Sequence, residues 1–175
     1  MRSYGGRFLM FQNIFMKSLS VLLGMMLIQT HVWAQWSTYT FTGAEKEIME
    51  VVEKETLSFF MGEYVDWKDC WYHGEDIYFE WVRSNIHHFY TSWEELDRTM
   101  RPIVAENVAS KDIFYVDRTD IQILREGDIA WVNYRQDLSG DRSHEQRVLR
   151  RVDGKWKIIM VTVVASDTFP KWTEN

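Results

Sequence analysis

The spacing of apolar residues changes from mainly helical to strand-like near residue 112, and this change limits the folds open to the chain. Before it, apolar side chains such as Ile48, Val52 and Phe59 recur every three or four residues, which is typical of an amphipathic helix. After it, apolar and polar residues alternate in five segments, which predicts strands. The five segments span residues 112–116, 120–124, 129–136, 144–152 and 155–164. Helices followed by linked strands predict an α+β domain with a mainly antiparallel sheet.

Three shorter elements are expected in the first half of the chain. "EYVDWKDCW" (63–71) predicts a second helical segment that ends at the "HG" of residues 73–74, because Gly favours the left-handed cap. "DIYFEWV" (76–82) alternates as a strand does, and "TSWEELDRTMRPIV" (91–104) predicts a helix that kinks or ends at Pro102. No repeat or linker interrupts these elements, so we expect one domain over residues 45–169.

The first 34 residues have the order of a secretory signal. A basic residue, Lys17, precedes an apolar run from Leu19 to Ile28, and the small residue Ala34 follows, after which we expect cleavage. Residues 1–15 are interpreted as an over-extended start, because Met16 precedes the basic residue. Residues 35–44 form a polar lead and 170–175 a tail. We therefore expect an exported protein, periplasmic or secreted, without stable membrane association after cleavage; an uncleaved anchor is the alternative.

Charge and cysteine content exclude several classes of function. Residues 1–34 hold three basic residues and no acidic one, so the remainder carries 17 basic and 26 acidic residues, a net charge of −9. Such an acidic domain repels phosphate backbones, and we expect no nucleic-acid partner. Cys70 is the single cysteine, so no intramolecular disulfide forms. Cys70 and His73 supply only two zinc ligands, and we expect neither a metal nor a cofactor.

The order of elements resembles the NTF2-like superfamily, also called SnoaL-like or cystatin-like. The resemblance rests on the long first helix, the helix opening "SWEEL" (92–96), and the strands ending "RVLRRVDGKWKIIMV" (147–161). It implies an exported bacterial branch with a cone-shaped domain, in which a curved sheet wraps the first helix around an apolar cavity. It also implies a homodimer formed through the outer face of the sheet. The superfamily includes enzymes and binding domains, and no catalytic motif of its enzymes matches this chain residue by residue.

The stretch from residue 58 to 81 concentrates aromatic side chains next to a few polar groups. Buried Trp and Tyr need partners for their polar atoms, so an aromatic set of this size indicates the wall of a cavity as well as a core. Packing in the core is the alternative for each Trp. Either His73 or His88, together with Arg147, is expected to orient a ligand. The candidate ligand-binding residues are Tyr64, Trp71, His73, Phe79, Trp81, His88, Tyr90, Trp93 and Arg147.

Three functions stay open on the sequence. The first is a module that binds a small apolar or aromatic molecule in the cavity. The second is an isomerase, cyclase or dehydratase in which a cavity carboxylate, Glu55 or Glu80 first, or a His moves a proton. The third is an interaction domain whose cavity is filled by Trp71, Trp81 and Trp93. An open cavity with a lone acid at its floor favours the second function, and one without such an acid favours the first.

Overall fold

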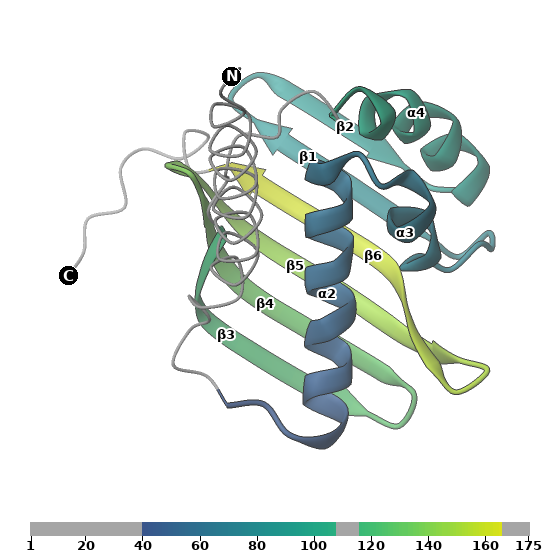
Figure 1. The fold of residues 1–175 in the computed structure, drawn as a ribbon, viewed down its shortest axis with the longest axis vertical. Helices are drawn as coiled ribbons and strands as arrows, with labels where there is room; N and C mark the ends of the chain where they lie inside the picture. The colour runs from purple at the N-terminus through teal and green to yellow at the C-terminus, as the bar shows by residue number, and fades with distance from the viewer. Residues whose placement is uncertain (1–39, 108–115, 166–175) are drawn as a thin grey trace, which may run out of the picture. The chain divides into compact units, whose positions relative to one another are not determined.

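The computed structural model of the protein describes residues 40–107 and 116–165. Within these residues, six strands form one sheet in the order β2-β1-β6-β5-β4-β3 (Figure 1). The sheet is mixed, because β1 runs parallel to β6 while the other neighbouring strands are antiparallel. The strands are β1 (Tyr78–Arg83), β2 (Ile86–Tyr90), β3 (Val116–Glu126), β4 (Ile129–Leu138), β5 (Asp141–Val152) and β6 (Lys155–Ala165).

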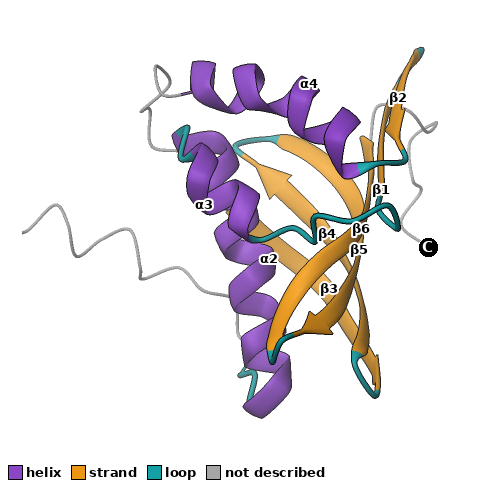
Figure 2. Cartoon of the chain, turned by 90° about the vertical axis from the view of Figure 1, so that its right-hand side faces the viewer, coloured by secondary structure: helices purple, strands orange, loops and turns teal. Residues whose placement is uncertain are grey.

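In the described part of the chain, three helices lie on one side of the curved sheet (Figure 2). They are α2 (Gly43–Met61), α3 (Tyr64–Asp69) and α4 (Trp93–Glu106). The longest, α2, runs across the face of the sheet, and α3 and α4 lie beside its C-terminal end (Figure 1). The prediction of an α+β fold with a curved, mainly antiparallel sheet and a long first helix is confirmed.

Three elements differ from the prediction in detail. Strand β2 was not predicted; it pairs with β1 over Phe79 to Arg83. Two separate strands were predicted at residues 112–116 and 120–124. The structure instead has one strand, β3, from residue 116 onward, with a bulge between Thr119 and Gln122. Residues 112–115 lie outside the described residues. Of the two alternatives for Pro102, the end of the helix is excluded: α4 continues to Glu106, because its apolar face buries Val104 beyond the proline, and tertiary packing outweighs the local cost.

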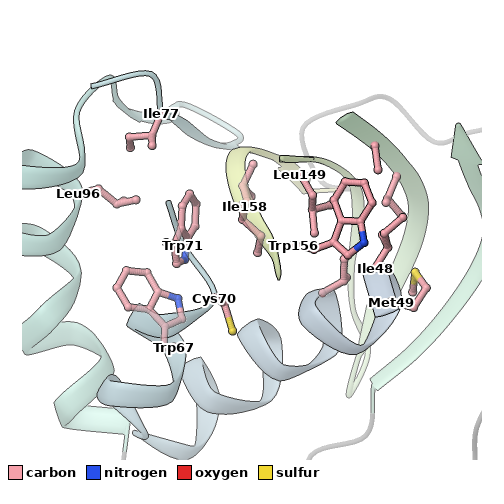
Figure 3. Close-up of a cluster of buried hydrophobic side chains, with 14 of the residues drawn as sticks. Ile48, Met49, Trp67, Cys70, Trp71, Ile77, Leu96, Leu149, Trp156 and Ile158 are labelled. Atoms are coloured by element: carbon pink, nitrogen blue, oxygen red, sulfur yellow. The ribbon is translucent and has the colours of Figure 1, made fainter. Parts of the chain in front are cut away.

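The core has two neighbouring parts (Figure 3). In one, Ile48 of α2 lies near Leu149 and Trp156 of the sheet. In the other, Trp67 and Trp71 lie near Leu96 of α4 and Ile158 of β6. Figure 3 shows the indoles of Trp67 and Trp71 on one side of Ile158 and that of Trp156 on the other. Ile158 therefore joins both parts of the core.

Backbone hydrogen bonds fix Trp71 in this core. The Tyr72 amide donates to the Ile158 carbonyl at 2.9 Å, and the Ile158 amide donates to the Cys70 carbonyl at 2.8 Å. The chain after α3 thus runs beside β6 before β1 pairs with the same strand farther along. The sheet holds Trp71 beneath the helices, where its side chain is 1% exposed.

Several predictions concern residues or properties beyond this description. The predicted signal segment, the polar lead up to residue 39 and the tail lie outside the described residues, and export stays a prediction. Pairing of two copies through the outer face of the sheet also stays a prediction. Within residues 40–107 and 116–165, no helix is both long and apolar enough to span a membrane.

Replacing Leu96 with Ala is expected to destabilise the domain strongly. The Leu96 side chain is fully buried between the helices and the sheet, so its truncation leaves a cavity and lowers the free energy of unfolding by about 2–5 kcal/mol. Val65→Ala on α3 is the control, because Val65 is 78% exposed and its loss should change stability by less than ~0.5 kcal/mol. Urea unfolding measures both; equal losses would contradict the described core.

Candidate functional site

A cavity of about 530 Å³ lies between α2, α4 and the inner side of the sheet. Side chains of β1, β2, β4, β5 and β6 line it, together with Glu55, Thr56, Phe59 and Phe60 of α2 and Thr99, Met100 and Ile103 of α4. Exposed lining residues, His88, Asp141 and Arg142, show that the cavity opens to solvent at one end. Its volume falls within the range of about 300–1,000 Å³ that is usual for small-molecule sites.

Aromatic and aliphatic side chains make most of the wall. Alternation along β1 turns Phe79 and Trp81 toward the cavity, whereas Glu80 between them pairs with His87 at 2.8 Å away from it. On the helices, Phe59 and Met100 contribute, at positions that also face the core. The apolar lining consists of Phe59, Phe60, Phe79, Trp81, Tyr90, Met100, Ile103, Leu138, Val161, Val163 and Ala165.

A buried ion-pair network forms the polar floor of the cavity. The guanidinium of Arg147 donates from one terminal nitrogen to Glu145 at 2.5 Å and from the other to Glu55 at 3.0 Å. These three side chains are 3–7% exposed. The remaining oxygen of Glu55 accepts a hydrogen bond from the Trp67 indole at 3.0 Å. The network therefore connects β5 with α2 and, through Trp67, with α3.

Glu145 accepts hydrogen bonds from four side chains. Besides Arg147, its donors are Tyr134 at 3.1 Å, Gln136 at 2.7 Å and Ser143 at 2.7 Å. The Arg147 guanidinium also lies over the Tyr134 ring, 5.4 Å from its centroid. Both oxygens of Glu145 are thus occupied by protein donors. The side-chain oxygen of Gln136 and Nε of Arg147 are buried with no hydrogen-bond partner among the described residues.

These contacts set the charge state of the floor. Burial alone would raise the pKa of Glu145, but Arg147 and the hydrogen bonds outweigh it and hold the pKa below its ordinary value. Burial alone would lower the pKa of Arg147, but the carboxylates of Glu145 and Glu55 hold it well above its ordinary value. Glu145 therefore stays ionised at neutral pH.

The mouth of the cavity carries paired charges of its own. Arg83 of β1 donates two hydrogen bonds to Asp141 of β5, at 2.7 and 3.1 Å. Arg142 donates to Asp137 at 3.0 Å. His88 of β2 stacks on Trp81, with the ring centroids 5.8 Å apart. The mouth is thus polar, and an aromatic pair lies beside it.

The structure divides the nine candidate ligand-binding residues between two places. Five line the cavity, namely Phe79, Trp81, His88, Tyr90 and Arg147. The other four do not line it, and the expectation that all nine converge on one site therefore differs from the structure. Those four, Tyr64, Trp71, His73 and Trp93, lie around α3 and the start of α4.

Packing against α3 accounts for these four positions. Trp93 stacks on Trp67 at 6.1 Å and on His73 at 4.2 Å between centroids. Tyr64 donates a hydrogen bond to Asp97 of α4. Tyr64 and Trp67 share a face of α3, but this face packs against α4 and not toward the cavity. The sequence shows that they share a face and does not show which neighbour that face meets.

Several lining residues were not among the candidates. Glu145 and Gln136 belong to the floor, and Met100 with Ile103 forms part of the α4 wall. Glu145 had a readable signal, because it stands two residues before Arg147 and so shares a strand face with it. Glu80 lies outside the cavity lining and pairs with His87.

Cys70 and groups of metal-binding side chains are further candidates for a reactive centre. Burial raises the pKa of the Cys70 thiol to about 12, so the reactive thiolate is scarce at neutral pH. Among the residues that the structure describes, no group of three or more His, Cys, Asp or Glu side chains is placed to hold a metal ion.

Replacing Arg147 with Met is expected to lower the free energy of unfolding by about 3–5 kcal/mol, because Glu55 and Glu145 would stay buried without a counter-charge. Arg135→Met is the control, since the Arg135–Asp120 pair is exposed and contributes less than ~1 kcal/mol. Urea unfolding at pH 7 measures the difference. A loss for Arg147→Met no larger than that for Arg135→Met would show that the network does not support the fold.

A pH-dependent gain in stability is expected for Glu53→Gln. Burial raises the pKa of half-buried Glu53 on α2 from 4.5 to about 7, although nearby Arg118 opposes the rise. The folded state then binds a proton more tightly than the unfolded state, so stability falls as pH rises through 7. Gln removes this loss.

At pH 8 the Glu53→Gln variant should be more stable than the natural chain by ~1 kcal/mol, a value reduced for solvent screening at a half-exposed group. The difference should vanish near pH 4.5, where Glu53 is largely protonated in the folded state. Thermal unfolding at both pH values measures it. Glu126→Gln, at an exposed end of β3, is the control; an equal gain there would point to net charge instead of burial.

Comparison with known proteins places the fold in a known group. Neither a scan of protein-family models nor a search of curated proteins finds a match. Among solved structures, a protein of unknown function with a cystatin-like fold from Nostoc punctiforme PCC 73102 is similar, with a TM-score of 0.57 and 14% identity. That match covers 75% of this chain and 98% of the other.

Two NTF2-like proteins of unknown function are similar as well. The one from Silicibacter pomeroyi DSS-3 has a TM-score of 0.56 and 12% identity over 71% of this chain and 99% of its own. The one from Shewanella oneidensis MR-1 has a TM-score of 0.56 and 13% identity over 70% of this chain and 99% of its own. The chain therefore has the NTF2-like, cystatin-like fold, and the predicted resemblance is confirmed at the level of the fold.

Proposed function

We propose that this NTF2-like domain binds a small, mostly apolar molecule in its cavity. The observation that carries the proposal is a cavity of about 530 Å³ that opens to solvent between aromatic walls and ends on a buried polar floor. Apolar walls supply binding energy in proportion to the ligand surface that they remove from water. A few fixed polar groups then orient the ligand.

The position of the aromatic residues favours binding over a purely structural role. Trp71 and Trp93, which were expected to close the cavity in an interaction domain, pack around α3 instead. Of the three residues in that hypothesis, only Trp81 lines the cavity. It forms part of the wall, where its ring stacks with that of His88. The core is thus built beside the cavity and does not fill it.

The state of the carboxylates favours binding over proton transfer. A catalytic base needs a carboxylate that is free to take a proton from the substrate. Glu145 is engaged by four donors, and Glu55 is engaged by Arg147 and Trp67. Among residues 40–107 and 116–165, no unpaired acid therefore stands at the floor, which is the condition under which the sequence favours a binding module.

A neutral fluorescent probe, N-phenyl-1-naphthylamine, tests the proposal. The probe brightens in apolar surroundings, so titration with the purified protein should give a saturable rise in fluorescence. Thr99→Trp on α4 would fill the cavity and should weaken probe binding by at least about tenfold, because the probe and the new indole compete for one space.

Arg98→Trp is the matched control. Arg98 is the exposed neighbour of Thr99 and does not line the cavity, so this variant adds the same indole on α4 and should bind the probe as the natural chain does. Urea unfolding establishes that both variants are folded. Saturable binding that Thr99→Trp leaves unchanged, or no binding by the natural chain, would overturn the proposal.

A further inference from the structure

The charged side chains that line the cavity balance one another. Three are arginines and three are acids, and each is paired with an opposite charge. The lining pairs are Glu55 with Arg147, Glu145 with Arg147, and Asp141 with Arg83, while Arg142 pairs with Asp137 just outside the lining. Arg118 and Asp137, which lie next to the lining, also carry opposite signs.

The pairing at the floor leaves little to neutralise a charged ligand. Both terminal nitrogens of Arg147 donate to carboxylates, so its positive charge is already paired, while its Nε, which is buried with no partner among the described residues, can donate to a neutral acceptor. An anion beside Arg147 would also lie close to the buried carboxylates of Glu55 and Glu145. It would lose its water and meet like charges, and would gain no unpaired counter-charge from Arg147.

A cation meets the same obstacle. The oxygens of Glu145 already accept hydrogen bonds from Arg147, Tyr134, Gln136 and Ser143. Glu55 accepts from Arg147 and from Trp67. A ligand ammonium group would lose its water without gaining a free carboxylate, and burying an unpaired charge is expensive.

The charged side chains at the mouth of the cavity are also paired, but they are more exposed than those at the floor. Arg83 donates two hydrogen bonds to Asp141, and Arg142 donates one to Asp137, but these side chains are 32–73% exposed. A single substitution there changes the net charge of the lining without removing a group of the buried floor.

We propose that the cavity selects electrically neutral molecules and rejects anions and cations of the same shape. This inference rests on the proposed function and adds the chemical class of the ligand: an apolar, uncharged molecule. The selectivity comes from a charge-balanced lining, in which each ion that a charged ligand could use already has a partner.

Two probes with one skeleton test the inference. N-phenyl-1-naphthylamine is neutral, and 1-anilinonaphthalene-8-sulfonate adds a permanent negative charge to the same rings. Both titrations are run at pH 8. Only binding that Thr99→Trp removes is counted as binding in the cavity. The neutral probe should bind at least about tenfold more tightly than the sulfonate, because the sulfonate would be buried without a partner.

A charge variant separates charge balance from simple size exclusion. Asp141→Asn removes one acid from the lining and so makes the net charge of the lining more positive. Because this charge attracts the sulfonate, the sulfonate should bind more tightly, and the preference for the neutral probe should fall by about threefold or more at low salt. Asp128→Asn is the control, because Asp128 is exposed in the β3–β4 turn and does not line the cavity. This variant has the same net charge as Asp141→Asn but leaves the lining intact.

The outcomes separate this inference from the proposed function. Equal or tighter cavity binding of the sulfonate by the natural chain would overturn the selection for neutral molecules and leave small-molecule binding standing. An affinity ratio that Asp141→Asn and Asp128→Asn change equally would also overturn it, because the preference would then not come from the lining. Cavity binding of neither probe would overturn the proposed function and this inference with it.

Discussion

The cavity floor and the attachment of α2 to the sheet both depend on the two ion pairs of Arg147. Through them, one side chain of β5 is bound to Glu145 on its own strand and to Glu55 on α2, with all three side chains buried. Burial makes the pairing obligatory, since either carboxylate without its partner would be an uncompensated charge inside the domain. The same contacts fix the distance between helix and sheet at the depth where the cavity ends. The floor of the cavity and the attachment of α2 are therefore one structure.

The aromatic residues after α2 serve two distinct purposes, and the path of the chain separates them. Trp67, Trp71 and Trp93 pack together between the helices, because the segment after α3 is hydrogen-bonded to β6 at Ile158. Phe79 and Trp81 follow on β1, where alternation turns them toward the cavity. The two groups meet where the rings of Trp71 and Phe79 lie 6.2 Å apart, and Trp67 joins the first group to the floor through its hydrogen bond to Glu55. The cluster of Trp67, Trp71 and Trp93 thus contacts the floor through Trp67, and β1 supplies part of the cavity wall.

Much of the fold can be predicted from the sequence. About half of the predicted site residues, five of nine, line the cavity. Periodicity locates α2, β4, β5 and β6, and the Asp153–Gly154 turn is predicted by its dipeptide, both residues having the positive φ that such a hairpin requires. Alternation places Trp81 on an inward face but cannot say how α3 turns, so Trp71 and His73 were expected at the cavity. Floor residues such as Glu145 and Gln136 come together through strand register, which local patterns do not contain.

A crystal structure of the protein with N-phenyl-1-naphthylamine tests the central claim, an apolar cavity closed at its base by a paired floor, most directly. The account predicts the probe between Trp81, Met100 and Val163, above an Arg147 side chain that keeps both of its carboxylate partners. A cavity filled by the protein's own side chains, or an Arg147 that leaves Glu55 or Glu145 to contact the probe, would contradict it.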